Sequence, residues 1–162
     1  MARWAELEEA EPEFATRARR LLDAHRHKTM ATLRRDGGPR ISGTEATFAD
    51  GDLWIGSMPG ALKALDLRRD PRVALHSGSV DAEEKDPGGW PGDAKVAGRA
   101  VELTTREEIA AFWKASGQPE MPGSHLFRID LEEVVLTHVE PPDGLVIESW
   151  HPGTGYRRRR RT

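Results

Sequence analysis

The sequence has 162 residues, of which 37% are hydrophobic and 31% charged; its net charge is −3 and it contains no cysteine. This length favours one domain with its own core, and the lack of cysteine excludes disulfides, a thiolate nucleophile and cysteine-ligated metals. No apolar run approaches the roughly 20 residues that span a bilayer. The acidic start MARWAELEEAEPEF argues against a secretory signal. We therefore expect a cytoplasmic protein without a membrane partner.

The charge is unevenly distributed along the chain. Residues 157–161 are five consecutive arginines, and since the net charge of −3 includes them, the other residues carry −8. So acidic a body opposes binding to phosphate backbones, and no nucleic-acid partner is expected. A solvated chain end is the simplest interpretation of the arginine block. The alternatives are a nucleic-acid tail, or a segment that folds onto a neighbouring subunit and contributes to an anion site.

The first half of the chain predicts a helix followed by hairpins. Apolar residues at helical spacing, with Pro12 in the first turn, predict a helix over residues 11–25, within a helical N-terminal arm of residues 1–26. Three strands follow between residues 28 and 57. The turn sequences Asp36-Gly37-Gly38 and Asp50-Gly51 separate them. Strands joined by such short turns pair antiparallel, so this part is a meander.

The second half alternates strands with two further helices. We expect a helix over residues 61–69, a strand from residue 72, a polar loop over 80–93 and a strand from residue 94. Thr105 and Glu108 form a capping box for a helix that Gly117 ends. A strand or bent strand pair over 125–140, a last strand over 144–150 and a basic tail over 151–162 complete the chain. The prediction is one mainly β domain, a six-stranded antiparallel barrel with flanking helices.

The stretch LWIGSMPGALKALDLRRDPRVAL, residues 53–75, combines a strand, a turn and a short helix. The unpaired amides at a helix start favour an anion. Ser57 can donate a hydroxyl, Gly60 permits close approach of the backbone, and Lys63 adds a full positive charge. The same residues are also compatible with an ordinary turn followed by a solvated lysine. The pattern alone leaves both interpretations open.

The order of these segments resembles that of the pyridoxamine-phosphate-oxidase-like flavoproteins, the FMN-binding split-barrel family that includes deazaflavin-dependent reductases. The resemblance rests on the hairpins before Ser57, on Lys63 opening the short helix, and on the sequences DPRVAL and KVAGRAVEL that follow. It covers about residues 28–103 and, more loosely, the ending LVIESWHPGTGYRRRR. Each segment is weak alone, and their order makes the match specific.

The resemblance implies a cofactor site and a dimer. Ser57 and Lys63 would hold the phosphate of FMN, or of a deazaflavin cofactor, and Gly56 would let the cofactor lie against its strand. The family forms homodimers with two interfacial sites, so Trp150 and the arginines after it would reach the partner's cofactor. The implied activity is an oxidoreductase that uses NAD(P)H or another small redox substrate, with no catalytic residue identified. Four residues on the neighbouring strand would face the ring and ribityl chain: Arg40, Ser42, Gly43 and Thr44.

Other activities are less well supported. The strand ISGTEATF and the C-terminal region depart from the vitamin-oxidising members, so vitamin B6 oxidation is not expected. A barrel that binds flavin or haem without turnover is the alternative to an enzyme. No metal site is expected, because His25 and His27 have no third ligand at matching spacing. The lack of Gly-x-Ser-x-Gly argues against an acyl-transfer hydrolase.

Overall fold

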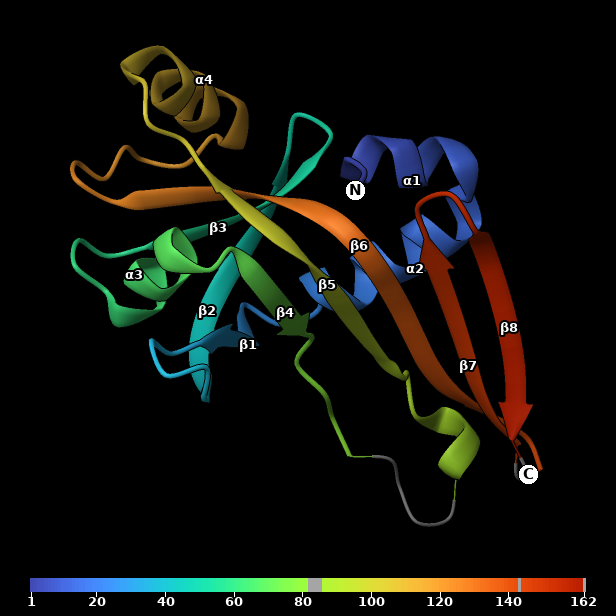
Figure 1. The fold of residues 1–162 in the computed structure, drawn as a ribbon. Coiled ribbons are helices and arrows are strands. Elements are labelled where there is room, and N and C mark those ends of the chain that lie inside the picture. Colours follow the sequence, from blue (N-terminus) through green and yellow to red (C-terminus); the bar gives the residue numbers. More distant parts are fainter. Residues whose placement is uncertain (82–85, 143, 162) are drawn as a thin grey trace.

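A computed structural model describes residues 1–81, 86–142 and 144–161 of the chain (Figure 1). The loop expected over residues 80–93 includes 82–85, which lie outside the described residues. A 3-10 helix, η1 (Pro87–Gly89), follows them. Within the described parts, no helix has both the length and the apolar character needed to cross a membrane.

The α-helices are α1 (Trp4–Ala10), α2 (Pro12–Asp23), α3 (Leu62–Arg69) and α4 (Arg106–Ser116). The strands are β1 (His27–Leu33), β2 (Pro39–Ala49), β3 (Asp52–Ser57), β4 (Arg72–His76), β5 (Asp93–Glu102), β6 (His125–Glu140), β7 (Gly144–His151) and β8 (Gly155–Arg161).

Strands β1 to β6 close into an antiparallel barrel. The strand order is β3-β2-β1-β4-β5-β6-β7-β8, and an additional pairing of β3 with β6 joins the two ends of the six-stranded part. The two turns predicted for the meander lie between β1 and β2 and between β2 and β3. Gly37, Asp50 and Gly51 adopt positive φ angles of 83°, 51° and 72° there, the conformations that tight hairpin turns require. The predicted six-stranded barrel with flanking helices is confirmed.

Strand β6 belongs both to the barrel and to an extension of the sheet. Its beginning pairs with β3, from His125 to Arg128, and its end pairs with β7, from Val134 to Glu140. Strand β5 pairs with β6 from Asp93 to Glu102, with one register shift between Ala97 and Gly98. Residues 125–140 are thus one long strand rather than a bent pair. The sheet continues beyond the barrel through β7 and β8, on the right of Figure 1.

The C-terminal arginine block is part of the sheet, so its interpretation as a solvated chain end was wrong. Strand β8 pairs with β7 from His151↔Gly155 to Leu145↔Arg161. A ladder uses only backbone groups, so a run of arginines can add a strand as long as their side chains remain in water, and these side chains are exposed. Tyr156 anchors the strand, since its ring lies 5.6 Å from that of Phe14 on α2.

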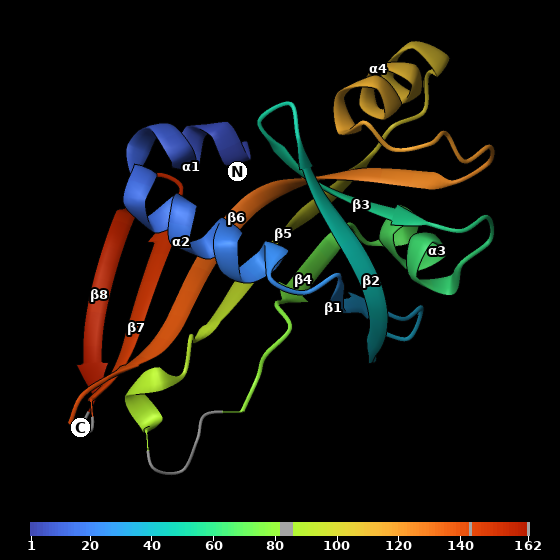
Figure 2. The same ribbon diagram turned by 180° about the vertical axis from the view of Figure 1, so that it is seen from behind.

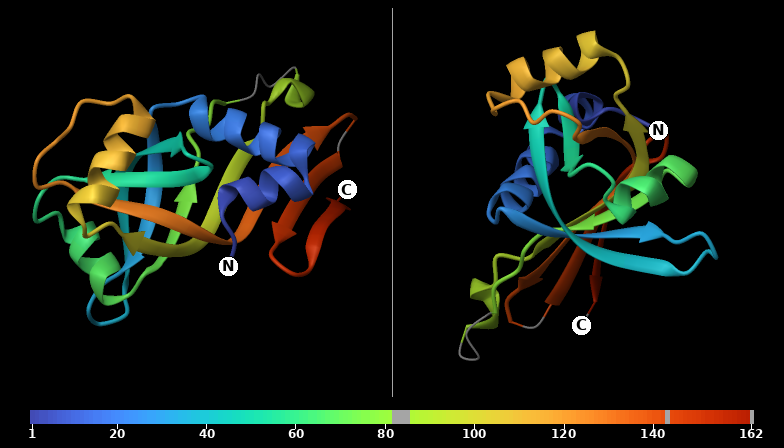
Figure 3. Two further views of the ribbon diagram at one scale, coloured as in Figure 1. Left: turned by 90° about the horizontal axis from the view of Figure 1, so that it is seen from above. Right: turned by 90° about the vertical axis from the view of Figure 1, so that its left-hand side faces the viewer.

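The helices cover different faces of the barrel. Helix α2 lies in front of β5 and β6 in Figure 2 and buries Phe14, Ala18 and Leu22 in the core. Helix α1 lies within the predicted helical N-terminal arm, although its own bounds were not predicted; it is short and acidic, and it buries only Trp4 and Leu7. The predicted starts and ends of α3 and α4 agree with the structure, including the Thr105 capping box. Figure 3 shows α3 and α4 at one end of the molecule, away from β7 and β8.

Candidate functional site

A cavity of about 370 Å³ opens on the outer side of the barrel. On β2, Thr44 and the alternating residues Gly43, Glu45 and Thr47 line the cavity, whereas Ala46 and Phe48 pack against the core. Since successive side chains of a strand point to opposite faces, the cavity lies outside the barrel wall. Its other walls come from β3, the start of α3, α4 and the segment after α4. Five of the eight predicted cofactor-binding residues line it: Gly43, Thr44, Gly56, Ser57 and Lys63.

Two glycines leave bare backbone on the strands that line the cavity. A Cβ atom added to Gly43 would have no neighbour within 4 Å, and one added to Gly56 would lie 3.9 Å from Leu126 Cδ2. Neither position has positive φ, so backbone conformation does not demand glycine there. What the glycines provide is room for a flat ligand to lie directly against the strands.

Lys63 is the principal cation of the cavity. Its Nζ donates a hydrogen bond of 2.6 Å to the Gly43 carbonyl oxygen. Burial lowers the pKa of Lys63 below its ordinary value, and the nearby Glu45 carboxylate partly opposes this. An anion in the cavity would give the ammonium a charged partner in place of a carbonyl, which is the stronger interaction. Ser57 lines the same region and is 9% exposed.

Gly60 contributes to the turn and not to the cavity wall. Its φ angle is 72°, which favours glycine, and its amide donates to His125 Nε2 at 3.1 Å. Of the three residues predicted for the anion site, Ser57 and Lys63 line the cavity, and Gly60 shapes the loop between them. His125 was not singled out for this role by the sequence, because it lies 65 residues further along the chain.

The remaining polar side chains include one acidic group. Arg26 and His27 at the start of β1 line the cavity, and Arg26 Nε lies 3.0 Å from Glu45 Oε1. Glu45 thus lies near both Arg26 and Lys63. Two fixed cations and one carboxylate leave the cavity with an excess of positive charge, which suits an anionic ligand.

Trp54 on β3, with Phe112 and Trp113 on α4, forms an aromatic wall of the cavity. The Trp54 ring centroid lies 5.1 Å from that of Phe112, which lies 5.0 Å from that of Trp113 on α4. The Trp54 indole donates to the Ala49 carbonyl at 2.9 Å, which fixes its ring. Gln118, beyond α4, donates to Thr47 across the cavity at 3.0 Å. Such a wall can contact a planar ring system through dispersion and aromatic contacts.

Arg40 and Ser42 do not reach the cavity. Neither is among its lining residues, which on β2 begin at Gly43. Arg40 instead donates to the buried Asp66 carboxylate, with Nε 2.5 Å from Oδ2. Thr32 and Arg69 donate to the same carboxylate. Arg40 is therefore held in an ion-pair network between β2 and α3.

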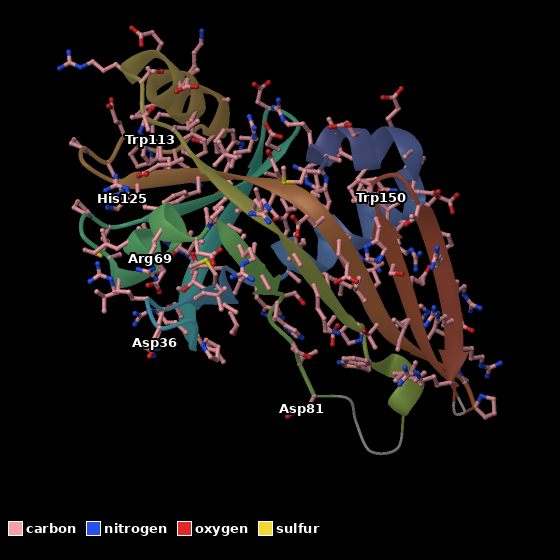
Figure 4. All side chains as sticks on the ribbon, in the orientation of Figure 1. Asp36, Arg69, Asp81, Trp113, His125 and Trp150 are labelled. Atoms are coloured by element: carbon pink, nitrogen blue, oxygen red, sulfur yellow. The ribbon has the colours of Figure 1, made fainter. Side chains whose placement is uncertain are left out.

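Trp150 lies at the opposite end of the molecule from the cavity, as Figure 4 shows for Trp150 and Trp113. It is 5% exposed and belongs to the main core. The expected contact of Trp150 and the arginines after it with a partner's cofactor concerns a dimer, and it stays a prediction.

The six-stranded antiparallel barrel, with its cavity against bare strand backbone, defines a split-barrel protein. The sequence profile of the family described as pyridoxamine 5'-phosphate oxidase matches residues 14–138. The chain belongs to this family, and the family resemblance expected from the sequence is confirmed.

Solved structures with the same fold are numerous, whereas no curated protein matches the sequence significantly. An FMN-binding protein related to pyridoxamine 5'-phosphate oxidase, from Nostoc punctiforme, is 13% identical with a TM-score of 0.63, covering 96% of each chain. PhzG from Burkholderia lata, in complex with tetrahydrophenazine-1-carboxylic acid, is 11% identical with a TM-score of 0.66, covering 97% of this chain and 92% of its own. A heme-binding protein from Mycobacterium smegmatis is 15% identical with a TM-score of 0.57, covering 89% and 86%. At these identities the likeness concerns the fold.

Proposed function

We propose that the chain binds FMN in the cavity beside Lys63 and acts as an oxidoreductase. The observation that carries this proposal is the combination of Lys63 and Ser57 with bare backbone at Gly56 and an aromatic wall at Trp113. Lys63 and Ser57 can bind a phosphate. The bare backbone at Gly56 and the aromatic wall at Trp113 can accommodate a planar ring. Membership of the pyridoxamine 5'-phosphate oxidase family supports the same cofactor. A deazaflavin cofactor is the alternative, since it too carries a phosphate and a planar ring.

The residues of the cavity would bind and orient this cofactor. Lys63 and Ser57 would contact the phosphate, and the backbone of Gly43 and Gly56 would lie against the ring or the ribityl chain. Trp113, with α4, would limit access of water. FMN, when bound, supplies hydride and electron transfer between a nicotinamide donor such as NAD(P)H and an acceptor. The protein is then required for binding, orientation and exclusion of water.

We further propose that the functional unit is a homodimer. Four large apolar side chains near the cavity are strongly exposed: Ile41 at 76%, Met58 at 72%, Leu62 at 61% and Met121 at 50%. Isolated exposed apolar residues are common, but several around one cavity are typical of an interface. A second copy covering them would also close the cavity. Sedimentation equilibrium at micromolar concentration should give twice the mass of the chain, and a monomer would contradict this part of the proposal.

The cofactor proposal is tested directly by what the purified protein binds. The absorption spectrum and mass of any co-purified small molecule distinguish FMN, a deazaflavin and haem. FMN titrated into protein freed of ligand should bind, and NADH or NADPH under anaerobic conditions should then bleach the flavin absorption. Binding without bleaching would favour the non-catalytic alternative. Failure to bind either flavin would contradict the proposal.

A further inference from the structure

A chain of hydrogen bonds connects the two ends of α3 through other parts of the barrel. Arg68, in the last turn of α3, donates to both carboxylate oxygens of Glu102 at 2.6 and 2.7 Å. Glu102, at the end of β5, lies 2.9 Å from His125 Nδ1 at the start of β6. His125 Nε2 accepts from the Gly60 amide, at 3.1 Å, in the loop before α3. Figure 4 shows His125 at this end of the molecule.

These contacts assign the tautomer of His125. Hydrogen bonds from Arg68 and from His125 lower the pKa of Glu102 despite its burial, so the carboxyl group is ionised at neutral pH. An ionised carboxylate has no proton to donate and acts only as an acceptor. The Gly60 amide can only donate. Both contacts are satisfied together only when His125 carries its proton on Nδ1 and presents the lone pair of Nε2 to Gly60. The side chain is 10% exposed, so water is a poor substitute for either partner.

The loop that His125 holds is the one between the two cavity-lining side chains. Ser57 ends β3 and Lys63 lies in the first turn of α3, so the path of residues 58–61 fixes their separation. Ser57 is also paired with His125 in the β3–β6 ladder. His125 thus contacts both ends of this segment. Its backbone pairs with Ser57, where β3 ends, and its ring accepts the hydrogen bond from Gly60 in the loop.

We infer that His125 is a positioning residue for the phosphate of the ligand: it holds the Gly60 amide so that Ser57 and Lys63 converge on one anion. This inference rests on the proposed function, because it concerns the same cavity. His125 acts through the loop, since it lies outside the cavity lining. The ring system of the ligand contacts α4 and the strands, so loss of the His125 contact should weaken binding of the phosphate far more than binding of the ring.

The alternative is that His125 only fills space. Its ring is stacked near that of Phe127, with a centroid separation of 6.4 Å and an interplanar angle of 28°. A phenylalanine at position 125 would preserve such packing but offer no acceptor to Gly60. A glutamine would offer its amide oxygen to Gly60 and remain neutral. The two substitutions therefore separate packing from hydrogen bonding.

The test compares FMN with riboflavin, which lacks the phosphate, in the wild type, His125→Phe and His125→Gln. Ligand-free protein is titrated with each flavin and followed by flavin fluorescence. His125→Phe should lower FMN affinity about ten-fold, as expected for a partly buried donor left without its acceptor, and should leave riboflavin affinity within about two-fold. His125→Gln should restore most of the FMN affinity. His76→Phe, on β4 and outside the cavity lining, is the matched control and should bind both flavins as the wild type does.

Each other outcome has a definite meaning. Unchanged FMN affinity in His125→Phe would overturn the inference while the proposed function stands. Equal losses for FMN and riboflavin, or a loss that His125→Gln fails to restore, would show that His125 does not act through its hydrogen bond to Gly60, and would also overturn the inference. Absence of FMN binding in the wild type would overturn the proposed function, and the inference with it. Thermal unfolding of all variants shows that the compared proteins are folded.

Discussion

Lys63 on α3 donates a hydrogen bond to the carbonyl oxygen of Gly43 on β2, with 2.6 Å between the two atoms. The contact places the ammonium group at the junction of helix and strand, where the cavity begins. A carbonyl is a neutral partner for a cation that burial has partly desolvated. An anion would therefore interact more favourably with the ammonium than the carbonyl does. The contribution of Lys63 to anion binding can be measured through the affinity for FMN.

Removal of the Lys63 ammonium should weaken FMN binding strongly. A hydrogen bond to a charged group contributes about 1.5–3 kcal/mol, so Lys63→Ala should lower the affinity roughly 10- to 150-fold. Ser57→Ala removes a neutral donor and should cost only about 0.5–1.5 kcal/mol. Fluorescence titration of FMN into ligand-free protein measures both. Lys114→Ala, on the exposed side of α4, makes the same change of charge outside the cavity and should bind normally. Equal affinities in all four proteins would contradict a phosphate site.

The affinity for FMN should also fall at alkaline pH. Only protonated Lys63 carries the charge that binds the phosphate, and burial lowers the pKa of Lys63 below the ordinary 10.5. Affinity is therefore full at neutral pH and declines as the pH rises through this lowered pKa. The measurement is the FMN dissociation constant between pH 7 and pH 10. Lys63→Arg keeps its charge over this range and should give a flat profile. An identical decline in Lys63→Arg would assign the effect to another group.

The aromatic wall should recognise the ring rather than the phosphate. Trp113 lines the cavity beside Phe112 and is half-buried without ligand. Aromatic pairs contribute about 1 kcal/mol beyond the area they bury, so Trp113→Ala should lower the affinity for FMN and for riboflavin alike, each about five-fold or more. Titration with both flavins checks this. A loss confined to FMN would mean that Trp113 acts at the phosphate.

The sequence predicted the part of the site that local chemistry determines. Ser57 and Lys63 lie six residues apart around a strand end and a helix start, so one short segment contains both of the proposed anion-binding groups and the turn between them. The turns at Gly37 and Gly51 likewise determine the antiparallel meander by backbone conformation alone. Both kinds of signal are contained in a few neighbouring residues.

The parts that the sequence did not predict depend on tertiary pairing. Gln118 reaches Thr47 across 71 positions, and His125 reaches Gly60 across 65. No local pattern identifies such partners. Strand β8 lacks the alternation of apolar and polar residues by which strands are recognised, and it forms because the edge of β7 offers it a ladder. Arg40 has the charge of a ligand-binding residue, but Asp66, 26 residues later, takes it into the barrel.

The attachment of β8 should depend on Glu148. This buried carboxylate of β7 accepts two hydrogen bonds of 2.6 Å from Arg17 on α2 and one of 2.5 Å from the Tyr156 hydroxyl on β8. Arg17→Ala leaves the carboxylate short of its charged partner and should lower the free energy of unfolding by about 2 kcal/mol, since Arg17 is partly exposed. Tyr156→Phe should cost about 1 kcal/mol. Urea unfolding measures both. Arg20→Ala, on the exposed face of α2, is the control, and a similar loss there would contradict a specific role for Arg17.

The Asp66 network should make the protein sensitive to acid. Burial alone would raise the pKa of Asp66, but hydrogen bonds from Arg40, Arg69 and Thr32 outweigh it and bring the pKa down to about 2. The unfolded chain has an ordinary aspartate pKa of about 3.9. Because the folded pKa is the lower one, the carboxylate stabilises the fold fully above about pH 4, and this contribution is lost as the pH falls towards 2.

Asp66→Asn should therefore lower the free energy of unfolding by about 1–2 kcal/mol at pH 7, and the difference from the wild type should shrink as the pH falls from 4 to 2. Urea unfolding at several pH values checks both the size and the direction. Asp70→Asn is the informative control. Hydrogen bonds from Arg72 also bring the pKa of Asp70 to about 2, but that ion pair lies at the surface, where solvent screens it, so a smaller loss is expected. If the two variants lose equal stability, burial of the Asp66 network is not what makes it stabilising.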